Sequence, residues 1–202
     1  AKYIVRCDME GVTGVVSMDQ VTPEGPEYGH GRLLFMEDLL ALVDGLLSGG
    51  ADQIVIYDEH YYGRNIDLAM LPPQVTAICG KPPYTRDWPG GFDESFAGMI
   101  LLGLHAMRGV TQGTLAHTYE PDIHSLMLNG MHIGEIGMEA AVAGDYGVPV
   151  LMVTADSKGI EEAQALLPGV RGVAVKQSRG ETGAVCLPPA TTSEMIRDAA
   201  AE

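Results

Sequence analysis

The segment Tyr3-Ile4-Val5-Arg6-Cys7-Asp8-Met9-Glu10-Gly11 decides the fold. Its first five residues are rich in β-branched and aromatic side chains, which is typical of a buried strand. Residues two apart on an extended segment point to the same side, so Asp8 and Glu10 share a face. The sequence therefore predicts a buried strand that brings two carboxylates together at its carboxyl end.

Strands and helices alternate along most of the chain. Apolar residues recur at helical spacing over 33–47, before Gly49-Gly50, and short apolar runs at 53–57 and 99–104 predict further strands. Buried strands separated by helices are typical of a largely parallel sheet with helices on both faces. We therefore expect an α/β fold. Other signals predict strands at 75–79, 148–154 and 170–175, and helices at 134–146, at 157–167 and from Met195 onward.

Two segments interrupt this alternation. Asn129-Gly130 lies between apolar runs at 123–128 and 131–133, which predicts a small inserted β-hairpin. The segment 81–91 is rich in proline and glycine, which predicts an irregular surface loop. No internal repeat or interdomain linker is visible, so residues 1–202 are expected to form a single α/β domain.

The charge balance excludes two classes of partner. Against 27 Asp and Glu the chain has only 12 Lys and Arg, giving a net charge of −15. Nucleic acids and anionic membrane surfaces bind clustered basic residues, which this sequence lacks, so neither is expected as a partner. Acidity favours solubility, and it also favours attraction of metal cations or of amines with positive charge.

The cysteines and the N-terminus indicate a cytoplasmic protein. Cys7, Cys79 and Cys186 are odd in number and widely spaced, which argues against a disulfide framework or a zinc ribbon. Each lies in an apolar run, so we expect buried free thiols in a reducing compartment. The chain begins with a strand-like run rather than a secretory signal.

Metal-ligand residue types follow three of the predicted strands. Asp8 and Glu10 follow the first, His60 follows the second, and His105 follows the run at 99–104. In open α/β sheets the carboxyl ends of the strands line one crevice, where ligands bind. Glu135 opens a predicted helix after the hairpin, and its side chain can face the same crevice.

Each of these residues alone has an ordinary explanation. An Asp at a strand end is often a turn residue, a lone His is often a hydrogen-bonded core residue, and a Glu suits a helix N-terminus. Their coincidence favours a metal site. Three carboxylates and two imidazoles suit zinc or manganese, and five ligands exceed what one catalytic zinc needs. We therefore predict two metals, bridged by Asp8, that activate a water and polarise a carbonyl.

Two neighbouring residues and a glycine-rich segment are expected to support this site. His117 follows the strand that ends in His105, and it is placed to move a proton or to stabilise an oxyanion. Asp58 shares a face with His60 and is predicted to orient it by a hydrogen bond. The glycine-rich segment from Gly11 lacks the lysine of a phosphate loop, so its glycines are interpreted as allowing close backbone approach.

These motifs together resemble the bacterial zinc D-aminopeptidases, a family of dipeptide-transport-associated, self-compartmentalising metallopeptidases. The resemblance covers nearly all of the chain in order. The main motifs that carry it are Asp8-Met9-Glu10-Gly11, Asp58-Glu59-His60, Gly103-Leu104-His105-Ala106, Ala116-His117-Thr118 and Gly134-Glu135-Ile136-Gly137. Further matches are Tyr28-Gly29-His30-Gly31-Arg32, the run from Val148 to Val153, and Val175-Lys176-Gln177.

The resemblance implies a function and a set of site residues. It implies removal of N-terminal residues, notably D-alanine, from short peptides in the cytoplasm, by a homodecamer of two stacked rings. It also implies that His117 is the catalytic histidine, assigned as nucleophile. The implied ligands of two zinc ions are Asp8, Glu10, His60, His105 and Glu135.

The chain departs from the family in length. Family members continue past the helix that is predicted near Met195, whereas this chain ends at Glu202 within an Ala-rich run. We therefore expect residues 1–202 to form the catalytic domain without the family's C-terminal portion. Either the chain is a processed or truncated form, or that portion is a separate polypeptide.

Two other functions fit the same residues. One is a dizinc amidohydrolase that acts on a different amide, since fold and metals do not fix the substrate. The other is a noncatalytic component that binds metal or peptide.

Overall fold

The computed structural model describes residues 1–202 and has one main sheet of seven strands in the order β3-β2-β1-β4-β7-β8-β9. Six of these strands are parallel, and β9 is antiparallel to β8. The predicted α/β fold is thereby confirmed. The strands are β1 (Lys2–Cys7), β2 (Gln53–Asp58), β3 (Val75–Ile78), β4 (Gly98–Leu104), β7 (Val150–Asp156), β8 (Arg171–Gly180) and β9 (Gly183–Cys186).

The strand order reverses direction at β1. The chain runs from β1 outward through β2 and β3, and then returns to place β4 on the other side of β1. At such a reversal the two connections leave in opposite directions, which opens a crevice beyond the carboxyl ends of the two strands. The segments that follow β1 and β4 therefore lie at the natural ligand site of the fold.

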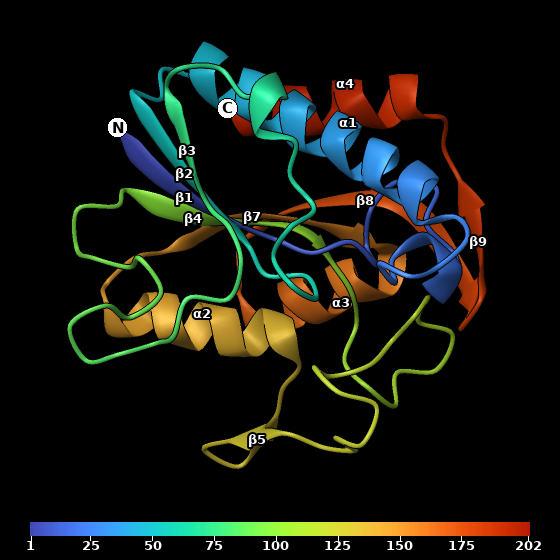
Figure 1. The fold of residues 1–202 in the computed structure, drawn as a ribbon. Coiled ribbons are helices and arrows are strands. Elements are labelled where there is room, and N and C mark those ends of the chain that lie inside the picture. Colours follow the sequence, from blue (N-terminus) through green and yellow to red (C-terminus); the bar gives the residue numbers. More distant parts are fainter.

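Helices cover both faces of the sheet, as Figure 1 shows. The first face carries α1 (Tyr28–Ser48) and α4 (Pro189–Ala201), and the second carries α2 (Glu135–Asp145) and α3 (Ser157–Leu166). Two short 3-10 helices, η1 (Met18–Gln20) and η2 (Leu68–Met70), lie in the connections. The residues thus form one three-layered unit, and none of its helices has the length and apolarity needed to span a membrane.

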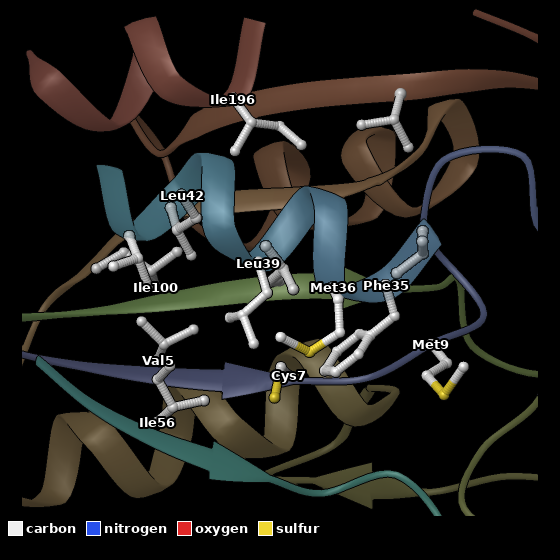
Figure 2. Close-up of a cluster of buried hydrophobic side chains, with 14 of the residues drawn as sticks. Val5, Cys7, Met9, Phe35, Met36, Leu39, Leu42, Ile56, Ile100 and Ile196 are labelled. Atoms are coloured by element: carbon white, nitrogen blue, oxygen red, sulfur yellow. The ribbon is translucent and has the colours of Figure 1, made fainter. Parts of the chain in front are cut away.

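The alternating sides of β1 explain its central place. Val5 and Cys7 face α1, and Figure 2 shows them packed below Phe35 and Leu39. Ile4 belongs to the second core, which α2 and α3 cover. Because both faces of the strand are buried, its sequence is almost continuously apolar.

The inserted hairpin forms as predicted. Strands β5 (Met127–Leu128) and β6 (Met131–His132) pair antiparallel and project away from the sheet in Figure 1. Asn129 and Gly130 have φ values of 51° and 82°, which are the left-handed conformations that a two-residue type I′ turn requires.

Three sequence predictions differ from the structure. Cys7 is buried, but Cys79 and Cys186 are exposed, so the expected burial of every thiol was wrong. Strand β9 was not predicted because it is a four-residue edge strand that begins with glycine. Helix α4 begins at Pro189, before the predicted start at Met195, because proline is favoured in the first turn of a helix.

A buried carboxyl group, Asp38, links α1 to the loop after β1 and to α4. Asp38 contacts the Thr13 hydroxyl at 2.8 Å, that hydroxyl contacts Thr192 at 2.8 Å, and Thr192 donates to the carbonyl of Pro189. The Thr13 amide also donates to the second carboxyl oxygen of Asp38, at 2.9 Å. Burial nevertheless raises the pKa of Asp38 to about 6.

We expect Asp38 to make stability depend on pH. The pKa of Asp38 is about 3.9 in the unfolded state and higher in the folded state. Between these two pH values the folded state binds more protons than the unfolded state, so the free energy of unfolding falls as pH rises. The Asp38→Asn variant keeps a donor for Thr13 without titrating. Its unfolding free energy, relative to the wild type, should rise by about 2–3 kcal/mol from pH 4 to pH 7 in urea titrations. An unchanged difference would show that Asp38 is ionised throughout.

Candidate metal centre

The parallel register brings the ends of β1, β2 and β4 together. Cys7 lies opposite Asp58 on one side and Leu102 on the other, so the next residues of each segment meet in space. The amide of Asp8 continues the ladder by donating to the carbonyl of Leu102 at 2.9 Å. Asp8, Glu10, His60 and His105 therefore converge at the reversal of strand order.

Two glycines allow the segment after β1 to press against the end of β4. A Cβ at Gly11 would lie 1.7 Å from the carbonyl oxygen of Leu104, which is impossible. Gly103 has a φ of 71°, and a Cβ there would lie 2.3 Å from the carbonyl oxygen of Asp8. The predicted role of Gly11 in close backbone approach agrees with this geometry.

A fully buried lysine holds the same segment from β8. The ammonium of Lys176 donates to the carbonyls of Glu10 at 2.6 Å, Val12 at 2.8 Å and Val15 at 2.6 Å. Burial lowers the pKa of Lys176 to about 8, so the group keeps three protons at neutral pH for three acceptors. Lys176 thus fixes the backbone from which Glu10 projects.

The first half of the cluster surrounds His60. Its Nδ1 lies 2.7 Å from Asp8 Oδ1 and 3.2 Å from Glu10 Oε2. Its Nε2 lies 2.7 Å from the carbonyl oxygen of Val21. All three cluster side chains are buried.

The second half surrounds His105, which is fully buried. Its Nε2 lies 3.3 Å from Asp8 Oδ2 and 3.4 Å from Glu135 Oε1. The ring of His117 stacks on His105 with centroids 4.1 Å apart, and its Nε2 lies 3.8 Å from Glu135 Oε1. Glu135 is the first residue of α2, and it also accepts from the amide of Tyr119 at 2.7 Å. The two carboxylate oxygens of Asp8 therefore face different halves of the cluster.

The three histidines are oriented alike by backbone carbonyls. His60 uses Nε2 for this contact, whereas His105 and His117 use Nδ1, toward Ala106 at 3.0 Å and Leu115 at 2.8 Å. A carbonyl oxygen only accepts, so the nitrogen that faces it must carry the hydrogen. In a neutral imidazole the other nitrogen then presents a lone pair, and in all three rings that nitrogen faces carboxylates.

Lone pairs that face carboxylates need a positive charge between them. Burial alone would lower the pKa of His60 and His105, but the neighbouring carboxylates outweigh burial and hold both pKa values well above the usual range. A proton on each ring therefore supplies part of this positive charge. Glu10 Oε2 and His105 Nε2 are nevertheless buried without a hydrogen bond. Buried unpartnered atoms of ligand type fit a bound metal cation.

Two overlapping sets of side chains have ligand atoms within 4.8 Å of one another. One set is Asp8, Glu10 and His105, and the other is His105, His117 and Glu135. With His60 beside Asp8 and Glu10, the geometry includes all five residues that were predicted as ligands, together with His117. The arrangement provides ligand atoms for a bound metal cation.

The predicted hydrogen bond from Asp58 to His60 was wrong. Asp58 accepts instead from the amide of Asn65 at 2.6 Å, from the Asn65 side chain at 2.8 Å and from the amide of Ile66. Asn65 then donates to the carbonyl of His60 at 2.9 Å. Asp58 therefore shapes the loop that carries His60, and the carbonyl of Val21 orients the ring.

A cavity of about 670 Å³ opens above the cluster. Asp8, Glu10, His60, His117 and Glu135 are among its walls. His117 is the most exposed of the three imidazoles, with 23% of its side chain accessible. A ligand in this cavity would contact His117 and the carboxylates directly.

Backbone strain is concentrated around this cavity. Tyr61, Leu115 and Tyr119 line it and have φ values of 49°, 52° and 55°, which are unfavourable for residues with a Cβ. Such strain persists where the surroundings enforce it and often marks functional sites. Here it places the carbonyl of Leu115 on His117 and the amide of Tyr119 on Glu135.

Sequence reasoning missed a second charged group beside the cluster. Arg6 on β1 is fully buried, and it pairs with Glu59 and lies 3.6 Å from Glu139 on α2. Burial raises the pKa of Glu139, and Glu139 Oε2 has no hydrogen-bond partner. An arginine inside an otherwise apolar strand was the available signal, because such a residue needs a buried carboxylate.

Comparisons with known proteins agree with this geometry. A family model described as Peptidase M55, D-aminopeptidase, matches residues 2–202. A D-aminopeptidase of Bacillus subtilis strain 168 is 31% identical over 198 residues, which cover 98% of this chain and 71% of that protein. The solved structure of the Zn-dependent D-aminopeptidase DppA of Bacillus subtilis, described as a self-compartmentalizing protease, aligns with a TM-score of 0.94 and 30% identity. This alignment covers all of this chain and 73% of that one, and the chain belongs to the M55 family of D-aminopeptidases, which are metallopeptidases.

Proposed function

We propose that this protein is a dizinc aminopeptidase that removes an N-terminal D-amino acid, such as D-alanine, from short peptides or amides. The observation that carries the proposal is the buried Nε2 of His105, which faces Asp8 and Glu135 without a hydrogen bond and lies in the same cluster as the unpartnered Glu10 Oε2. The Zn-dependence of the related DppA supports zinc as the metal.

The two oxygens of Asp8 support a binuclear site. Asp8 Oδ1 faces His60 and Glu10, and Asp8 Oδ2 faces His105 and Glu135. Asp8, Glu10, His60, His105 and Glu135 would hold the two zinc ions, and both oxygens of Asp8 would be available as ligands. Two bound zinc ions supply Lewis acidity, which polarises a carbonyl and lowers the pKa of a water molecule.

The residues of the chain then position and protonate the reacting groups. The scissile carbonyl lies over Asp8 and Glu135, with the peptide in the cavity of about 670 Å³. Nδ1 of His117 is held on the Leu115 carbonyl, so Nε2 is free to accept a proton from the attacking water. The same Nε2 then gives that proton to the departing amine nitrogen, which avoids expulsion of an amide anion.

The proposed proton-transfer role of His117 and the geometry that allows it as a ligand are both tested by one variant. We expect His117→Asn to lower kcat by about 10²–10⁴-fold, as loss of a proton-transfer group does, with zinc content unchanged. Steady-state kinetics and elemental analysis of the same preparation check this. Loss of zinc would make His117 a ligand.

The substrate is tested with paired compounds. Zinc-loaded protein should hydrolyse D-alanyl amides and dipeptides faster than their L forms, and should leave N-acetylated forms intact. Release of free amino acid, followed by chromatography, measures this. Activity only on β-aminoacyl or N-acyl amides would favour the alternative dizinc amidohydrolase, and bound metal without turnover would favour a noncatalytic binding component.

The proposal also includes the oligomeric state of the protein and its location in the cell. The related DppA is self-compartmentalizing, which supports a homo-oligomer, and we propose the decamer of two rings in the cytoplasm. We also propose that residues 1–202 are the catalytic domain. Light scattering of the purified protein gives the mass of the assembly.

A further inference from the structure

A second cavity of about 490 Å³ adjoins the metal centre. It shares Asp8, Glu59, Lys81, Tyr119 and Glu135 with the larger cavity, so the two meet at the cluster. Its remaining walls are mostly apolar or aromatic and come from β2, the loop after β3 and helix α2. They include Tyr57, Pro82, Pro83, Tyr84, Met138 and Val142.

The carboxylate of Glu139 lies in the wall of this second cavity. Glu139 is 8% exposed and makes no hydrogen bond, and its Oε2 pairs at 3.6 Å with Arg6 Nε, which has no hydrogen bond of its own. Glu139 follows Glu135 by four residues on α2, so both side chains lie on the same face of the helix. A buried carboxylate with one long ion pair is only partly satisfied, so it favours a ligand that donates a hydrogen bond to it.

Arg6 satisfies the Glu139 carboxylate only in part. Its guanidinium is held between the rings of Tyr57 and Phe92, at 4.4 Å and 4.6 Å from their centroids. NH1 donates to Glu59 and to Tyr84, NH2 donates to a backbone carbonyl, and Nε remains 3.6 Å from Glu139 Oε2 without a hydrogen bond.

The other nearby cation is Lys81, and it is also engaged elsewhere. Its ammonium donates to the carbonyl oxygen of Glu59 and makes no ion pair with Glu59 or Glu139. The Arg6 guanidinium therefore faces two carboxylates, those of Glu59 and Glu139. Glu139 can still accept hydrogen bonds from a cation.

We propose that this second cavity binds the side chain of the substrate's N-terminal residue, and that it selects a protonated amine through Glu139, supported by Glu59. The inference rests on the proposed aminopeptidase function and extends it to a substrate class, namely peptides with an N-terminal residue like lysine. The apolar walls suit a methylene stem, and the aromatic rings stabilise a nearby cation. An alanyl methyl group would leave most of this cavity unfilled.

The test compares lysyl and norleucyl p-nitroanilides of matching chirality, because both side chains are unbranched and only one is charged. For the zinc-loaded wild type we expect kcat/KM to be at least about tenfold higher for the lysyl compound, as a charged hydrogen bond provides. The Glu139→Gln variant should lower this ratio at least about tenfold, mainly through KM. The Glu59→Gln variant should lower it less, and Glu37→Gln, an exposed charge change on α1, should keep it.

Three results would overturn the proposal. They are equal kcat/KM for both compounds in the wild type, a preference for the lysyl compound that survives Glu139→Gln, and a loss of kcat/KM in Glu139→Gln that is equal for both compounds. Circular dichroism and zinc content establish that each variant is folded and loaded. If neither compound is hydrolysed, the proposed function fails, and calorimetry with lysinamide and norleucinamide still decides. Tighter binding of lysinamide that depends on Glu139 supports the cavity, and equal binding refutes it.

Discussion

The Asp8→Asn variant is expected to lose both zinc ions and to lower kcat/KM on the order of 10³-fold. The reason is that Asp8 Oδ1 lies 2.7 Å from His60 and Asp8 Oδ2 lies 3.3 Å from His105, so one carboxylate reaches both halves of the cluster. Asparagine keeps the oxygen that accepts from the amide of Met9 at 2.9 Å, which preserves the local backbone. Zinc per chain and hydrolysis rate are measured on the same sample.

The matched comparison uses two further variants, each of which changes a carboxylate in one half of the cluster. Glu10→Gln alters only the half with His60, and Glu135→Gln alters only the half with His105. Each should retain about one zinc per chain, whereas Asp8→Asn retains none. A full zinc complement in Asp8→Asn, with folding confirmed by circular dichroism, would contradict the bridging role of Asp8.

Replacing Lys176 by methionine is expected to destabilise the protein by at least about 3 kcal/mol. Methionine preserves the apolar stem, but three buried carbonyls, of Glu10, Val12 and Val15, lose their donor. Each unsatisfied group costs about 1–3 kcal/mol. Urea unfolding with a chelator present measures the change without a contribution from bound zinc.

The control for this variant is Lys158→Met. Lys158 also makes an ion pair, with Glu161 at 2.6 Å, but that pair lies on the surface of α3. Its loss should change the unfolding free energy by less than about 1 kcal/mol. If Lys176→Met were equally mild, the segment that carries Glu10 would be held by other contacts. Weaker zinc affinity in Lys176→Met is expected as well, because Glu10 loses its fixed backbone.

The fold was predictable because its main signal is local. Apart from Arg6, the run from Tyr3 to Cys7 is apolar on both sides, because α1 covers one face of β1 and α2 and α3 cover the other. Strand β9 escaped prediction because an edge strand buries little and Gly183 weakens its pattern. The start of α1 at Tyr28 precedes the apolar periodicity, because its first turn packs against η1 rather than against the sheet.

The candidate ligands were predictable because parallel strands end at one edge of the sheet. Their partners were not, since these depend on loop conformation. The carbonyl of Val21 reaches His60 from a segment that no spacing rule connects to it. Likewise, Arg6 and Glu139 lie 133 positions apart, and only the packing of α2 against the sheet brings them to 3.6 Å. Long-range contacts of this kind leave no periodic signal.

The most direct measurement is the zinc content of the purified wild type by elemental analysis, beside a double variant with His60→Ala and His105→Ala. We predict about two zinc ions per wild-type chain and none in the double variant, with circular dichroism showing that both are folded. A folded wild type that binds no metal after incubation with zinc would contradict the account, because its histidines would then be structural.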